Sequence, residues 1–190
     1  MALDYTNNRE AAVNLLKKHV KGDRYEHSLG VEHAAVALAE RYGADPEKAG
    51  LAGLLHDIAK QMNQDKLIQD YGIYSPSDRT VHGPLGAAWL RDHGYVDDED
   101  VLNAIRYHTT GRPAMSLLEK IVYIADAIEP GRKSQEADIL RDFASEDLDK
   151  AVLYSLECSL RRVLENQHLI DPDTVSAYND YRRLFDRSEV

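Results

Sequence analysis

The chain has 190 residues, 43% of them hydrophobic, with a formal net charge of −10 at pH 7 and one cysteine. This length suits one domain, and the excess of acidic residues argues against a general nucleic-acid partner. A single cysteine rules out an intramolecular disulfide and fits a reducing cytoplasm. No segment is apolar over the length of a membrane span, and the start of the sequence lacks the basic and apolar regions of a signal peptide, so we expect a cytoplasmic protein with neither membrane nor nucleic-acid partners.

Helical patterns dominate the first half of the chain. The expected helices cover residues 9–20, 25–42, 46–60 and 64–71. Asp23 is the expected cap of the second helix and Gly43 its stop, while Asp45 caps the third, which has proline at its first position. Residues 72–82 form a loop by their Gly, Pro and Ser content.

The second half continues the same pattern. Its expected helices cover residues 83–93, 97–107, 116–128, 148–166 and 173–184, the last capped by Asp173. Strand patterns and hairpin turn pairs are absent from the sequence. We therefore predict an all-α fold of about eight to ten helices. Residues 1–190 should form one domain, with residues 145–190 as C-terminal helices packed on the core.

His56 and Asp57 are the most informative pair in the sequence. They lie near the end of residues 49–58, a stretch with no other charged residue. Burying a carboxylate is costly unless it is paired or bound to metal. Asp126 similarly ends the apolar run IVYIAD, and His27 opens a helix whose inner face continues at helical spacing. Nitrogen and oxygen ligands pointing inward from several helices are how helical bundles build metal sites.

The remaining histidines fall into two groups. Surface or capping positions are expected for His19, His33, His93 and His168. His108 instead extends the apolar stripe of its own helix, and His82 immediately precedes a helix start. Either one alone would be read as an ordinary hydrogen-bonded histidine, but together with Asp57 and Asp126 they suggest a shared site. A mixed nitrogen and oxygen set suits iron, manganese, zinc or cobalt better than magnesium or calcium.

Several polar residues near these ligands are candidates for binding phosphate or a base. Lys60 follows Asp57 by one helical turn and is either a solvated lysine at a helix end or a cation that meets a substrate phosphate. Arg24 has the same two interpretations, a solvated cation or a contact with a substrate phosphate. Further phosphate candidates are Thr109, Thr110 and Arg132. Three tyrosines could either stack on a base or be half-buried in the core: Tyr25, Tyr74 and Tyr107.

These residues resemble the HD-domain superfamily of metal-dependent phosphohydrolases. The resemblance rests on the segments RYEHSLGV, AGLLHDIAK and IVYIADAIEPGR, and HDIAK is similar to the superfamily's HD-x-x-K extension. The HTTG and EPGR segments narrow the match to the bacterial YqeK-type subfamily. The resemblance implies an all-helical HD fold and symmetrical bis(5'-nucleosyl)-tetraphosphatase activity, the hydrolysis of diadenosine tetraphosphate.

The resemblance also implies roles for individual residues. Iron, as one or two ions, would be held by His27, His56, Asp57 and Asp126, with manganese, cobalt or zinc as alternatives. His82 and His108 would bind a second metal or phosphate oxygens, and the catalytic roles would fall on Asp57 and Lys60. The implied nucleotide contacts are Arg24, Lys60, His82, Thr109, Thr110, Arg132, Asp171 and Asp173. For Asp171 and Asp173, the start of a capped helix is the competing interpretation.

The hypothesis is a metal-dependent hydrolase that cleaves diadenosine tetraphosphate symmetrically into two ADP, by metal-activated water attack on a central phosphorus. One alternative is another HD phosphohydrolase, acting on guanosine tetraphosphate, a deoxynucleotide or a cyclic dinucleotide. A second is a non-catalytic helical binding module with a structural metal, although such sites are usually closed and rich in cysteine. The partner we expect is a small-molecule dinucleoside polyphosphate, and a homodimer is compatible with the sequence.

Overall fold

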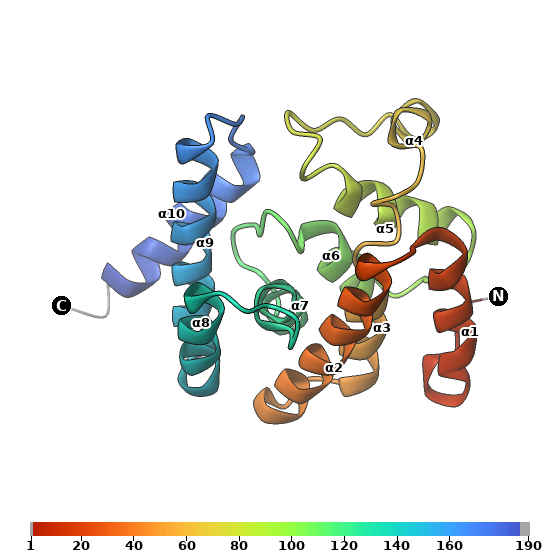
Figure 1. Cartoon of the computed structure of the whole chain (residues 1–190), viewed down its shortest axis with the longest axis horizontal. Coiled ribbons are helices and arrows are strands. Elements are labelled where there is room, and N and C mark those ends of the chain that lie inside the picture. Colours follow the sequence, from red (N-terminus) through yellow and green to blue (C-terminus); the bar gives the residue numbers. More distant parts are fainter. Residues whose placement is uncertain (1, 187–190) are drawn as a thin grey trace.

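The computed structural model describes residues 2–186, which form ten helices and no strand (Figure 1). The helices are α1 (Tyr5–His19), α2 (Asp23–Tyr42), α3 (Pro46–Leu55), α4 (Gln64–Tyr71), α5 (His82–Asp92), α6 (Glu99–Tyr107), α7 (Leu117–Ile128), α8 (Gln135–Glu146), α9 (Leu148–Glu165) and α10 (Pro172–Asp186). The predicted all-α class is confirmed. Within the described residues, no helix is long and apolar enough to cross a membrane.

Helix α7 lies at the centre of the fold. It contacts α2, α3 and α6 on one side and α8 and α9 on the other, as its end-on position in Figure 1 shows. Its sequence is accordingly apolar around most of its surface, and Ile121, Val122 and Ile124 are fully buried. A capping box of Ser116 and Glu119 begins the helix, so its start is well defined. The central position of α7 carries its last turn, with Asp126, into the interior.

The expected helix over residues 46–60 is too long. Helix α3 ends at Leu55, and the chain continues from His56 in tighter turns. The Ile58 amide donates to the Leu55 carbonyl at 3.0 Å, and the Lys60 amide donates to the Asp57 carbonyl at 2.9 Å. These bonds span three residues instead of the four of an α-helix. His56 and Asp57 therefore lie just beyond the helix and not within it.

Helix α8 is the one element that our reading of the sequence omits. Its first turn is capped by Ser134, whose hydroxyl accepts from the Ala137 amide at 3.2 Å. Ala137, Leu140 and Ala144 are its buried residues, at helical spacing. Two of the three are alanines, so the apolar stripe is weak in the sequence. The division of the chain into one domain, with residues 145–190 packed on the core, stays a prediction.

Three expected helix starts differ from the structure. Helix α1 begins at Tyr5 and has a non-helical residue at Asn8, so it starts before the apolar pattern does. Asp23 is the first residue of α2 and not its cap, since Gly22 precedes it at φ 60° and no side chain caps the helix. At α10 the Asp173 amide donates to Asp171 Oδ1 at 3.0 Å, so Asp171 fills the capping role expected of Asp173.

Candidate metal centre

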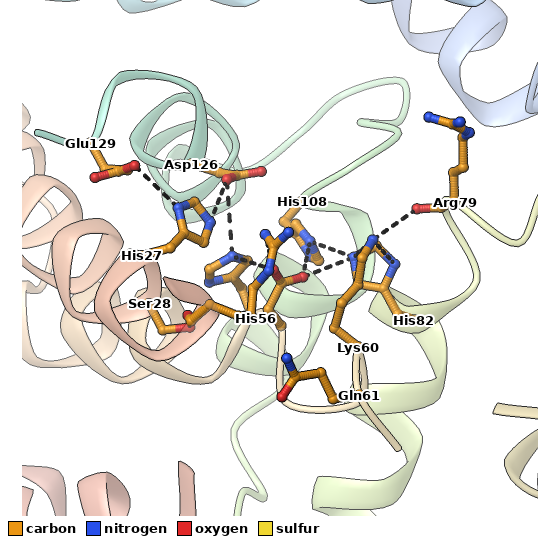
Figure 2. A network of polar contacts seen from close by, with 12 residues as sticks. His27, Ser28, His56, Lys60, Gln61, Arg79, His82, His108, Asp126 and Glu129 are labelled. Carbon is orange, nitrogen blue, oxygen red and sulfur yellow. Dashed lines mark hydrogen bonds and ion pairs between the residues drawn. The ribbon is translucent and has the colours of Figure 1, made fainter. Parts of the chain in front are cut away.

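Six side chains from five segments of the chain meet in one cluster, and Figure 2 labels most of them. They are His27 on α2, His56 and Asp57 after α3, His82 at the start of α5, His108 directly after α6, and Asp126 on α7. Four of them are at most 2% exposed: His56, Asp57, His82 and His108. The fold thus brings together all six residues that the sequence nominated as metal ligands or ligands of a second metal or phosphate.

Asp57 lies in the middle of this cluster. Its Oδ1 atom is 3.0 Å from Nε2 of His82 and 3.6 Å from Nε2 of His108. Its Oδ2 atom is 3.5 Å from Nε2 of His56. One carboxylate therefore faces three imidazoles with its two oxygens, an arrangement in which it can contact two neighbouring cations.

Asp126 occupies the other end of the cluster. Its Oδ1 atom is 3.0 Å from Nε2 of His27 and 4.0 Å from Nε2 of His56. Both of these ring nitrogens are buried and make no hydrogen bond. Buried imidazole nitrogens without a proton partner, set between carboxylates, match the nitrogen and oxygen ligands that transition metals take. The residues present therefore fit the metal that an HD site implies.

The outer nitrogens of the histidines orient the rings toward the centre. His56 Nδ1 donates to the Gly53 carbonyl at 2.7 Å, and His108 Nδ1 donates to the Ile105 carbonyl at 2.7 Å. His27 Nδ1 donates to the Glu129 carboxylate at 3.2 Å. Each of these bonds requires a proton on Nδ1, so Nε2 is the ring atom that faces the centre. Such outer partners are the usual support of metal-binding histidines.

The charges in the cluster favour the protonation states of metal ligands. Desolvation alone would raise the pKa of Asp57, but its contacts with His56, His108 and His82 lower it well below its ordinary value. The pKa of Asp126 is also lowered, because its contact with His27 and the nearby His56 and His108 outweigh its burial. Burial lowers the pKa of His82 to about 4, against the opposing effect of Asp57. At neutral pH this gives two ionised carboxylates and a neutral His82, the protonation states that metal binding requires.

Three cations contact the cluster from its rim. Their contacts are Arg24 Nη1 to Asp57 Oδ2 at 2.8 Å, Lys60 Nζ to His82 Nδ1 at 3.0 Å, and Arg132 Nη2 to Asp126 Oδ1 at 2.9 Å. Lys60 is half-buried and also lies 3.4 Å from the Arg79 carbonyl. Its position beside His82 argues against a fully solvated lysine. Positive charge on three sides makes the centre suitable for an anionic substrate.

The other candidate contacts divide between two clefts. Thr110, Asp171 and Asp173 line a cleft of about 360 Å³ together with Tyr74 and Tyr107. We call it the Tyr107 cleft. Both oxygens of Asp171 are already used there, since Oδ1 caps α10 and Oδ2 accepts from Ser75 and Thr80.

Thr109 lines a different cleft, with Arg132 and Asp126, between α7, α8 and α9. Tyr25 is in neither of these two clefts, and its ring lies 5.7 Å from Lys17 Nζ. Two adjacent threonines that the sequence suggested as one phosphate-binding pair therefore serve different surfaces.

Glu129 is a site residue that our reading of the sequence missed. It is 5% exposed, its Oε1 accepts from His27, and its Oε2 accepts from the Gly131 amide at 2.5 Å. A Cβ atom added to Gly30 would lie 2.6 Å from the same Oε2 atom, so a larger residue there would displace the Glu129 carboxylate. An acidic residue three positions after Asp126 and directly before Pro-Gly could have signalled this role. Glu129 holds the His27 ring and the turn that carries Arg132.

We expect Glu129→Gln to weaken metal binding by about 10- to 100-fold, because the charge that orients and polarises His27 is lost. Competition with a chelator measures the affinity directly, without turnover. Glu26→Gln is the matched control, since this exposed glutamate is on the same helix as His27 but does not contact its ring. Wild-type metal affinity in Glu129→Gln would show that the contact with His27 has no role in the centre.

The all-helical fold and the histidine–aspartate cluster define a metal-dependent hydrolase of the HD type. The HD domain family matches residues 24–131, and the chain belongs to this family. It is 41% identical over 179 residues to the symmetrical bis(5'-nucleosyl)-tetraphosphatase of Halalkalibacterium halodurans, covering 90% of this chain and 96% of that protein. The protein of the same name from Staphylococcus aureus is 42% identical over 182 residues, 90% of each chain.

A solved structure shares the fold over nearly the whole chain. It is a crystal structure from Clostridium acetobutylicum, described as a predicted HD superfamily hydrolase involved in NAD metabolism. The TM-score is 0.86 and the identity 41%, over 96% of this chain and 99% of that one. The resemblance to the HD superfamily that the sequence motifs suggested is confirmed.

Proposed function

We propose that this chain is a symmetrical bis(5'-nucleosyl)-tetraphosphatase that hydrolyses diadenosine tetraphosphate to two ADP. The observation that carries the proposal is the cluster of four histidines and two aspartates, contacted by three cations, in a chain closely similar to relatives of that name. A substrate with several phosphates is strongly anionic, and this is the part of the described chain where ligands for a metal and positive side chains coincide.

In this proposal each residue of the centre has a specific role. His27, His56, Asp57 and Asp126 would hold the first metal, and His82 and His108 would hold a second metal or contact phosphate oxygens. Iron is our choice of metal, and manganese, cobalt and zinc also suit the ligand set. When bound, the metal lowers the pKa of water and polarises the phosphoryl group. Asp57 orients the attacking water.

Arg24, Lys60 and Arg132 offset the charge on the phosphoryl oxygens as the transition state forms. The Tyr107 cleft receives one nucleoside, with ring surface from Tyr74 and Tyr107 and a hydroxyl from Thr110. The leaving group is a nucleoside diphosphate, which is stable without a strong general acid. No further proton donor is required of the chain.

The positions of cleavage and of water attack test this function. In ¹⁸O-labelled water, chromatography of the products from diadenosine tetraphosphate should give ADP alone, with one labelled oxygen per pair. AMP and ATP would contradict symmetrical cleavage. If iron or manganese is present and no product forms, guanosine tetraphosphate, deoxynucleotides and cyclic dinucleotides are the substrates to try, because these HD reactions share the metal site.

Lys60→Ala should lower kcat/KM by about 10- to 100-fold, equivalent to about 1.4–2.7 kcal/mol, because a cation beside the reacting phosphate is lost. The melting temperature should stay nearly constant, since the side chain is at the edge of the core. Lys66→Ala on exposed α4 is the control for loss of a lysine charge. An unchanged kcat/KM in Lys60→Ala would mean that Lys60 does not contact the substrate phosphate and is a solvated lysine.

We place the enzyme in the cytoplasm, where a free cysteine stays reduced. A homodimer is part of the proposal as well, and light scattering of the purified protein tests it.

A further inference from the structure

A cleft of about 290 Å³ extends from the metal centre along α9, on the side away from the Tyr107 cleft residues. Its polar lining includes Thr109, Asp126, Arg132, Ser155, Ser159 and Arg162. We propose that this Ser159 cleft binds the second nucleoside of a dinucleoside polyphosphate, the half that leaves. The inference rests on the proposed function and adds a separate subsite to it.

The spacing of residues on α9 builds the polar wall of the cleft. Ser155, Ser159 and Arg162 follow each other at intervals of four and three residues, so they lie on one face of the helix. Both serines are half-buried. The Arg162 guanidinium is held by Glu136 of α8 at 2.6 Å, so a cation and a carboxylate are fixed at the outer end. Hydroxyls and charges placed this way can pair with the hydroxyls of a ribose and the edge of a base.

The floor of the cleft is apolar. Ala137 and Leu140 of α8 line it and are at most 2% exposed. Thr109 adds a buried hydroxyl oxygen that makes no hydrogen bond within the described chain. The lining is therefore mixed, with more polar than apolar surface, and the volume is close to the lower end of the range for sites of small organic ligands. A nucleoside matches both properties.

The larger groove on the α2 side of the centre is a weaker candidate. It measures about 590 Å³ and is lined by Arg24, His27, Glu129 and other charged residues or glycines, with Pro130 as its one apolar side chain. That groove is more open to solvent than the Ser159 cleft, and its charged lining suits phosphates. The more enclosed Ser159 cleft is therefore favoured for the nucleoside.

The two clefts lie on opposite sides of one short segment. Tyr107 and Thr110 line the Tyr107 cleft, whereas His108 and Thr109 line the Ser159 cleft. His108 belongs to the metal centre, so that centre lies where the two clefts approach each other. A long, pseudo-symmetric substrate with its central phosphates at the metal would place one nucleoside in each cleft. This arrangement explains why an enzyme of this kind would favour two nucleosides over one.

The test compares a substrate with two nucleosides and a competitor with one. KM is measured for diadenosine tetraphosphate, and the inhibition constant is measured for adenosine 5'-tetraphosphate, which has the same phosphates and a single nucleoside. Ser159→Leu, which fills the cleft, should raise KM about tenfold and leave the inhibition constant within about twofold of the wild-type value. Arg162→Ala should change KM in the same direction, and Glu165→Leu, on an exposed part of the same helix, is the control.

Each outcome bears on the proposal. Equal increases in KM and in the inhibition constant would mean that the cleft acts through phosphate or metal binding. Unchanged values of both constants in both variants would mean that nothing binds in the cleft. Either result overturns the inference. If Ser159→Leu fails to fold, Arg162→Ala alone decides, because Arg162 is exposed on the helix surface. Absence of hydrolysis by the wild-type enzyme would instead contradict the proposed function.

Discussion

Asp57→Asn should lower kcat by at least about a thousandfold, or roughly 4 kcal/mol, and remove most of the bound metal. Asparagine keeps the shape of the side chain but loses the charge that three histidines and Arg24 surround. Because Asp57 is 2% exposed, no water can substitute for its oxygens without rearrangement of the cluster. Both the metal and the attacking water would lose the group that holds them.

Elemental analysis of the purified variant measures the metal, and initial rates with diadenosine tetraphosphate measure turnover. The double variant His82→Ala/His108→Ala is the informative comparison, since it should keep part of the metal at the His27, His56 and Asp126 end of the cluster. Circular dichroism confirms that each variant is folded. Full metal content and full activity in Asp57→Asn would show that the centre of this protein is elsewhere.

Gly83→Ala should destabilise the protein by about 1–3 kcal/mol, because the new methyl group meets backbone that cannot yield. A Cβ atom there would lie 2.7 Å from the Arg106 carbonyl oxygen and 3.1 Å from that of Ile105. Helix α5 would have to move away from α6. His82 begins α5 and His108 directly follows α6, and their Nε2 atoms are 3.1 Å apart, so the candidate metal centre would open as well.

Thermal unfolding should show a melting temperature lower by about 2–12 °C for a chain of this size, and kcat/KM should decrease at a temperature where the variant is folded. Gly72→Ala is the matched control: its Cβ would meet nothing within 4 Å, so it has only the local strain of φ +63°. If Gly83→Ala lowered the melting temperature no more than Gly72→Ala does, then the close packing of α5 on α6 would not require glycine at position 83.

Much of this protein can be predicted from the sequence because helices and buried charges leave local signals. The apolar stripes of α2, α7 and α9 recur at helical spacing, and most expected helix ends agree with the structure to within a few residues. His56, Asp57 and Asp126 stand out since ionisable groups in apolar segments are too costly to bury without a partner. The motif order then suggested the family, which the comparisons confirm.

What the tertiary structure alone decided involves contacts between distant segments. Glu129 becomes a support for His27 only when α7 packs on α2, across 102 residues of sequence. Asp171 replaces Asp173 as the cap because its other oxygen binds the loop before α5. Thr109 and Thr110 face different clefts because α9 and α10 arrive on different sides of their turn. Local patterns predict which side chains are buried or helical, but the partner of each group depends on packing between segments far apart in the chain, and no short-range pattern records that packing.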